Sequence, residues 1–115
     1  MNRSLLAIAA SIALIFQGAA FAQTPDLSAA IEARDTNALA GLGEGRGREA
    51  ALARGVLAAL HRQDEEAVRN LRTAARSRAL NDELRASAWQ TLSGVYLRQS
   101  RFAEAAEGMS AAAAF

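Results

Sequence analysis

The chain has 115 residues, 51% of them hydrophobic and 22% charged, which is the composition of one folded domain and not of a disordered segment. Thirteen arginines, with no lysine, oppose twelve carboxylates, and a formal charge of +1 is too small for the positive field that nucleic acid or an anionic membrane requires. The lack of cysteine excludes disulfides, thiolate chemistry and a lipid-modified cysteine anchor.

Residues 1–22 have the three parts of a signal peptide. Arg3 gives a positive start, residues 5–16 form a run of apolar and small residues, and Ala20 and Ala22 place small residues where signal peptidase needs them. The run falls short of the roughly 20 apolar residues that span a bilayer, which argues against an uncleaved anchor. We therefore expect cleavage before Gln23 and a periplasmic or secreted bacterial protein with no stable membrane anchor. Loss of Arg3 would leave the mature chain formally neutral.

Residues 23–47 predict a short helical hairpin followed by a glycine-rich linker. Apolar residues recur at helical spacing on both sides of the polar Asp35-Thr36-Asn37, and Asp26 is placed to cap the first helix. From Gly41 to Gly47 every second residue is glycine, and each glycine costs a helix about 1 kcal/mol relative to alanine. We expect a hinge or loop there. A phosphate-binding loop would need a preceding strand and a following Lys-Ser or Lys-Thr, which are absent.

Residues 48–80 predict two helices separated by the polar break at residues 61–63. Asp64 is expected to cap the second helix, and Glu65 stands four residues before Arg69, the spacing of a helical ion pair. The apolar stripe of that helix consists of Ala67, Val68, Leu71, Ala74 and Ala75.

Residues 81–115 predict a second helical hairpin. Asn81 begins its first helix, and Gln99 and Ser100 separate the two helices. The wide apolar face of the first helix consists of Leu84, Ala88, Trp89, Leu92, Val95 and Tyr96. The helical period of the second consists of Phe102, Ala105, Ala106, Met109, Ala112 and Ala113. The sequence therefore predicts an all-α chain of short antiparallel hairpins.

This last hairpin resembles a tetratricopeptide repeat (TPR), whose pattern is W-x2-L-G-x2-Y followed by A-x3-F. The matching residues are Trp89, Leu92, Ser93, Tyr96, Ala105 and Met109, with Phe102 at the start of the second helix. Trp89 and Tyr96 would lie between the two helices, and the small Ser93 would allow them to approach closely. Met109 stands where an aromatic residue is usual.

A weaker copy of the pattern lies 38 residues upstream, in residues 48–80. Its matching residues are Gly55, Ala67, Leu71 and Ala74; its departures are Arg54 for Leu92, Ala58 for Tyr96 and Asp64 for Phe102. The offset of 38 also exceeds the usual 34. The resemblance covers residues 48–115 and implies a short TPR-like α-solenoid.

The resemblance also implies a concave groove that is lined by the first helix of each repeat and holds a segment of a partner protein. The groove residues would be Glu49, Leu52, Val56, Ala59 and Leu60 in the first repeat, and Ser87, Gln90, Gly94, Leu97 and Arg98 in the second. Arg98 is the foremost candidate, because a planar guanidinium can hold a carboxylate or a backbone carbonyl. The alternative is a solvated arginine at a helix end.

No catalytic, cofactor-binding or metal-binding constellation is predicted. His61 has no partner at metal-ligand or catalytic spacing. The acidic clusters 64–66 and 82–83 open helices, where the helix dipole accounts for them.

Three functions are compatible with this sequence. The first is an exported module that binds a protein partner through the groove. The second is the N-terminal domain or a fragment of a larger periplasmic enzyme, such as a retropepsin-like aspartyl protease, although no D-T-G or D-S-G motif is present. The third is a structural unit that self-associates through its last helix, because fewer than three helical repeats are seldom stable alone and no cap follows residue 115.

Overall fold

The computed structural model describes residues 26–115, and the expected signal peptide lies outside this range. Within it the chain forms helices and no strands, so the predicted all-α fold is confirmed. The helices are α2 (Leu27–Ala33), α3 (Thr36–Gly43), α4 (Arg48–Leu60), α5 (Asp64–Ala75), α6 (Asp82–Arg98) and α7 (Phe102–Ala113). No helix in this range is long and apolar enough to cross a membrane.

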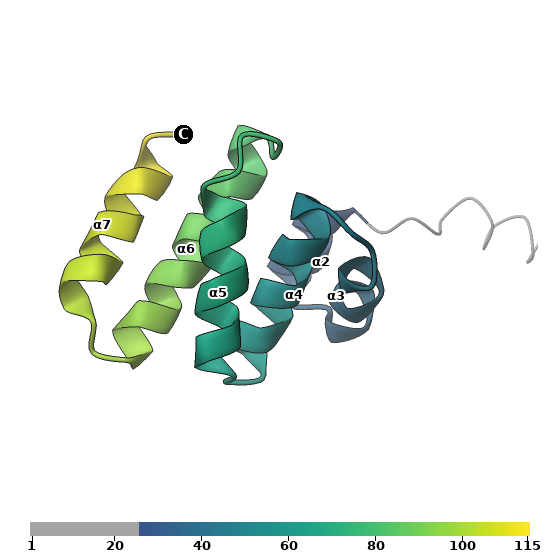
Figure 1. Ribbon diagram of the computed structural model, residues 1–115, viewed down its shortest axis with the longest axis horizontal. Coiled ribbons are helices and arrows are strands. Elements are labelled where there is room, and N and C mark those ends of the chain that lie inside the picture. The colour runs from purple at the N-terminus through teal and green to yellow at the C-terminus, as the bar shows by residue number, and fades with distance from the viewer. Residues whose placement is uncertain (1–25) are drawn as a thin grey trace, which may run out of the picture.

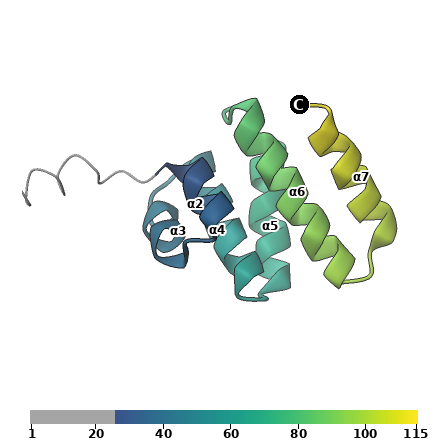
Figure 2. The same ribbon diagram turned by 180° about the vertical axis from the view of Figure 1, so that it is seen from behind.

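Successive helices lie side by side and alternate in direction (Figure 1). In Figure 1 α5 lies in front of α6, whereas the reverse view in Figure 2 places α6 in front. Helix α2 contacts both α4 and α6. The first helices of the three hairpins are therefore neighbours, and α5 lies on the other side of α6.

One leucine from each of α3, α4, α5 and α6 is fully buried and forms the centre of the core. These residues are Leu39, Leu52, Leu71 and Leu92, each with 0% exposure. Each buried leucine contributes about 1.5–3 kcal/mol relative to an exposed one. Alanines fill most of the remaining core, so the helices can approach closely.

Three helices begin with a side-chain cap. The carboxylates of Asp26 and Asp35 and the side-chain oxygen of Asn81 accept backbone N–H groups of the first turn at 3.2, 3.1 and 2.9 Å. The prediction for Asp64 was wrong, because Gln63 occupies the cap position and makes no side-chain cap bond. Asp64 is the first helical residue, and its carboxylate is engaged elsewhere.

All three hairpins turn in the same way. Arg34, Arg62 and Ser100 adopt the left-handed conformation, with φ of 53°, 62° and 59°. In each turn the next residue donates its N–H to the carbonyl five residues before it, at 3.0, 2.9 and 2.8 Å, which is the Schellman arrangement that closes a helix end. A single turn geometry therefore recurs with three different local sequences.

The second and third hairpins share one register. The end of the first helix and both ends of the second recur 38 residues later, at Leu60 and Arg98, Asp64 and Phe102, and Ala75 and Ala113. The offset inferred from the sequence pattern is therefore also the offset of these helix boundaries, although α6 begins earlier in its hairpin than α4 does.

The predicted glycine-rich loop is shorter than expected. Helix α3 continues through Gly41 and Gly43, and the break covers residues 44–47. Gly43 is buried, and a β-carbon there would lie 2.9 Å from Cγ of Arg54. Arg54 in turn donates to the Gly43 carbonyl at 2.8 Å and to the Gly45 carbonyl at 3.2 Å, which satisfies the end of the helix.

Both aromatic residues of the last hairpin contribute to its packing. Tyr96 is buried, and Trp89 is half-buried against the core. Between α6 and α7 a β-carbon at Gly108 would overlap Oγ of Ser93 and lie 3.6 Å from Cε3 of Trp89. Small residues on both helices therefore permit this close contact.

Arg101 fixes the turn that joins α6 to α7. Its guanidinium stacks 4.6 Å from the centre of the Tyr96 ring, and its Nε donates to Glu104 at 2.7 Å. This hydrogen bond from Arg101 lowers the pKa of the Glu104 carboxyl. By contrast, the expected pair of Glu65 and Arg69 is not among the salt bridges of residues 26–115.

The outer face of α7 differs from the predicted packing. Phe102 and Met109 are 65% and 49% exposed, and the buried residues of α7 are Ala105 and Gly108. Leu71, which corresponds to Met109 in the first repeat, is fully buried in α5, and α6 packs against α5. No described helix covers α7 in the same way.

Candidate binding cleft

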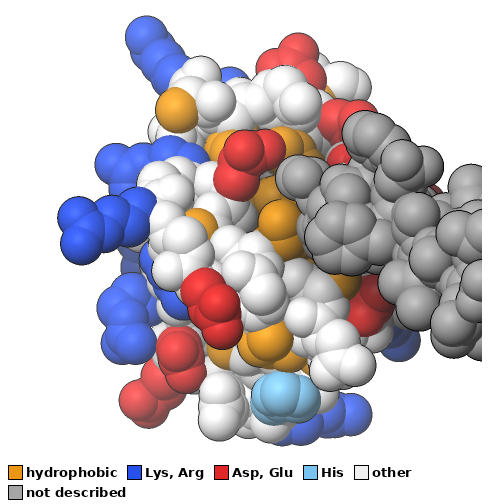
Figure 3. All heavy atoms as spheres, turned by 90° about the vertical axis from the view of Figure 1, so that its right-hand side faces the viewer, with side chains coloured by type: hydrophobic (Ala, Val, Ile, Leu, Met, Phe, Trp, Pro, Cys, Tyr) orange, Lys and Arg blue, Asp and Glu red, His pale blue; other side chains and the backbone are white. Residues whose placement is uncertain are grey.

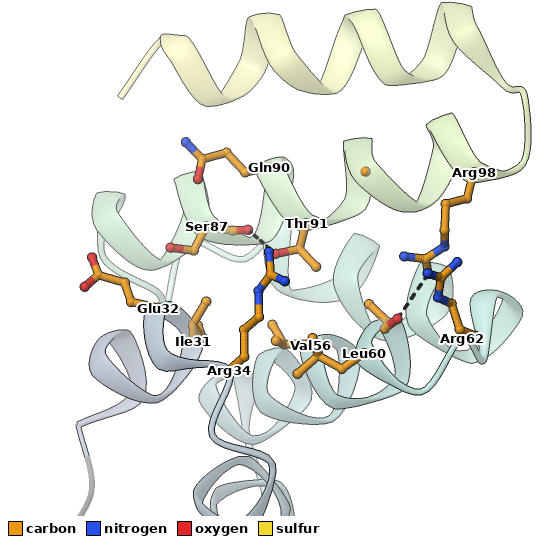
Figure 4. Close-up of a pocket in the computed structure, with 12 residues that line it drawn as sticks. Ile31, Glu32, Arg34, Val56, Leu60, Arg62, Ser87, Gln90, Thr91 and Arg98 are labelled. Atoms are coloured by element: carbon orange, nitrogen blue, oxygen red, sulfur yellow. Dashed lines mark hydrogen bonds between the residues drawn. The ribbon is translucent and has the colours of Figure 1, made fainter.

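A cleft of about 610 Å³ lies where α2, α4 and α6 meet (Figure 4). Its lining comes from these three helices and from the turns that follow α2 and α4. The lining residues are Ile31, Glu32, Arg34, Val56, Ala59, Leu60, Arg62, Ser87, Gln90, Thr91, Gly94 and Arg98.

The cleft has an apolar floor and a polar wall. Ile31, Val56 and Leu60 contribute the larger apolar side chains, and α6 contributes Gln90 and Thr91. The Thr91 hydroxyl donates to the carbonyl of residue 87 at 2.9 Å, so its proton is already used within the helix. The exposed Gln90 amide makes no hydrogen bond with the described residues, which leaves it available to a ligand.

Arg98 is engaged within the protein, contrary to its expected role as a free contact. Its Nη2 donates to the Ala59 carbonyl at 3.1 Å and to Oδ1 of Asp64 at 2.5 Å. It therefore ties the last turn of α6 to the end of α4 and the start of α5. The side chains of Arg98 and Asp64 remain 30% and 27% exposed, so this pair contributes at most about 1 kcal/mol to stability.

Two other arginines line the cleft without such partners. Arg34 and Arg62 are exposed and belong to the turns after α2 and α4. Within residues 26–115 neither forms a salt bridge or a side-chain hydrogen bond. Figure 4 shows Arg34 extending towards Thr91 from below and Arg62 beside Arg98 at the other end.

The cleft contains seven of the ten residues predicted to line the groove. These are Val56, Ala59, Leu60, Ser87, Gln90, Gly94 and Arg98. Leu52 was wrongly placed at the surface, because it is fully buried in the core. Glu49 in the first turn of α4 and Leu97 near the end of α6 are exposed but do not line the cleft.

Sequence reasoning missed the contribution of α2 and of the two turns. The repeat pattern covers residues 48–115 and therefore does not include Ile31, Glu32 and Arg34. A usable signal was present, because Ala30-x3-Arg34 and Ala58-x3-Arg62 have the same spacing and form the same turn.

His61 lies exposed in the turn after α4, and Figure 3 shows the histidine at the molecular surface. Residues 26–115 contain no group of three His, Cys, Asp or Glu side chains arranged to hold a metal ion. The side chains that line the cleft offer hydrogen bonding, ion pairing and apolar contact.

No protein-family model, curated protein or solved structure matches this chain.

Proposed function

We propose that this protein is an exported TPR-like module that binds a protein partner in the cleft between α2, α4 and α6. The repeated 38-residue register and the shared turn geometry support a stack of equivalent hairpins. In such a stack the first helices share one face, which suits an extended segment of a partner. The amino-terminal pattern in residues 1–22 supports export to the periplasm or beyond.

The observation that carries this proposal is the composition of the cleft. The concave surface combines an apolar floor with a polar wall and charged ends. Ligand-binding sites typically have this composition, in which a few polar groups fix the orientation of the ligand. Residues from three separate helices contribute to it, so the surface exists only in the folded chain.

Gly94→Leu should abolish partner binding without unfolding the protein. A β-carbon at Gly94 meets nothing within 4 Å, so a leucine fits the free protein and projects into the cleft. The tagged variant is used to capture proteins from an envelope extract, and the captured proteins are identified by mass spectrometry. The band of the specific partner should be missing. Circular dichroism should show unchanged helicity.

Gly41→Leu is the matched control. Gly41 is also helical, exposed and free of neighbours within 4 Å, but it does not line the cleft. This variant should retain the partner. Equal capture by both variants would contradict the proposal. Arg98→Ala is a less specific test, because it also removes the bonds of Arg98 to the Ala59 carbonyl and to Asp64.

Self-association is the second candidate. The exposed Phe102 and Met109 lie on one outer face of α7, together with Ala106 and Ala113. Such a face favours contact with another helix. A sedimentation coefficient that rises with protein concentration would favour this candidate, if Met109→Glu abolishes the rise.

A further inference from the structure

We infer that the cleft selects a peptide segment that combines an acidic residue with an apolar one. This inference rests on the proposed function and specifies the class of segment that the cleft accepts. It depends on Arg34 and Arg62, which sequence reasoning did not identify.

The charge of the cleft is unbalanced although the chain is nearly neutral. Its lining contains three arginines and one carboxylate, Glu32. Figure 4 shows the Glu32 side chain directed away from the arginines. Asp64 balances Arg98 from outside the lining, which leaves Arg34 and Arg62 without a described acidic partner.

The Asp64 contact engages only one of the two guanidinium groups at this end of the cleft. Oδ1 of Asp64 lies 2.5 Å from Nη2 of Arg98, and Figure 4 places Arg62 next to Arg98. The two guanidinium groups carry one more positive charge than the single Asp64 carboxylate, which pairs with Arg98, can balance. A ligand carboxylate that accepts charge-assisted hydrogen bonds from Arg62 would neutralise this remaining positive charge.

The apolar floor adds a second requirement. In Figure 4 Val56 and Leu60 lie between Arg34 and Arg62, and Ile31 lies on the other side of Arg34, so an apolar ligand side chain on this floor would have its acidic neighbour within reach of an arginine. A membrane surface fits this arrangement less well, because the floor is recessed between three helices and a lipid headgroup layer is broad and flat.

Selection from a library of random peptides displayed on phage, with the purified protein as bait, tests this inference. Enriched peptides should combine Asp or Glu with Leu, Ile, Val or Phe. A synthetic peptide from the enriched set should bind up to about fivefold more tightly than its Gln or Asn analogue, as expected for one exposed ion pair. The double variant Arg34→Gln with Arg62→Gln should bind this peptide more weakly than the parent by the same factor.

The double variant Arg76→Gln with Arg78→Gln provides the matched control. It removes the same charge at exposed positions beyond α5, outside the cleft, and should bind the peptide almost as the parent does. Equal losses in the two double variants, enrichment of neutral or basic peptides, or no enrichment would overturn the inference. Binding to phosphatidylglycerol vesicles that requires Arg34 and Arg62 would overturn it in favour of a lipid ligand.

The two proposals can fail separately. If Gly94→Leu abolishes capture of the natural partner but the Arg34 and Arg62 changes do not weaken it, the cleft is the binding site and the acidic preference is wrong. If Gly94→Leu has no effect on capture, the proposed function itself fails.

Discussion

Gly55→Val should destabilise the protein by about 3 kcal/mol, the upper range for overpacking a tight core. At Gly55 in α4 even a single β-carbon would lie 2.8 Å from Cγ of Leu71 and 3.1 Å from its backbone nitrogen. Because Leu71 is fully buried in α5, relief would require the two helices to separate. Urea unfolding followed by circular dichroism should show a large fall in the midpoint.

Gly94→Ala serves as the control for this substitution. Gly94 also lies inside a helix, but its added β-carbon would meet nothing within 4 Å. It should therefore gain about 1 kcal/mol from helix propensity. An unchanged midpoint for Gly55→Val would show that α4 and α5 are not packed as described.

Leu92→Ala should cost about 2–5 kcal/mol, the range for truncating a fully buried leucine. Leu92 is 0% exposed on α6, three residues after Trp89. Domains of this size have a total stability of only about 5–15 kcal/mol, so the variant should lose a large share of it and melt at a clearly lower temperature. Thermal melts measured by circular dichroism should show this loss.

Leu97→Ala in the same helix is the matched variant. Leu97 is 43% exposed, so its truncation should change stability by about 0.5 kcal/mol or less. Similar melting temperatures for the two variants would contradict the assigned inward face of α6.

The helices and their inward faces were predictable because their signals are local. Polar breaks at residues 61–63 and 99–100 ended helices where expected, and the periodic apolar residues of α5 and α6 entered the core. The caps Asp26 and Asn81 followed from the same short-range chemistry.

The charged contacts were not predictable because they join residues far apart in the chain. Arg98 finds Asp64 34 residues away and the Ala59 carbonyl 39 residues away, which no helical periodicity encodes. Local reasoning instead assigned Asp64 to a cap and Arg98 to a ligand. Because Arg98 pairs with Asp64, the cleft arginines without a described acidic partner are Arg34 and Arg62.

The exposure of α7 was missed for a related reason. A helical period shows which residues share a face, but it does not show whether another helix covers that face. Phe102 and Met109 lie on such a face, and in residues 26–115 nothing packs over it as α6 packs over α5.

The continuity of α3 was missed because glycine propensity is only one term in helix stability. The glycines 41 and 43 cost the helix about 1 kcal/mol each, yet Leu39 is buried and Arg54 satisfies the terminal carbonyls. Tertiary contacts of this kind outweigh a local preference.

Site-specific photo-cross-linking in the living envelope tests most directly whether the cleft is the face that binds a partner. A photoreactive residue at Gln90, which lines the cleft, should give one discrete adduct with another protein, whereas the same residue at the exposed Thr73 of α5 should give none. Adducts from Thr73 alone, or the same adducts from both positions, would contradict the account.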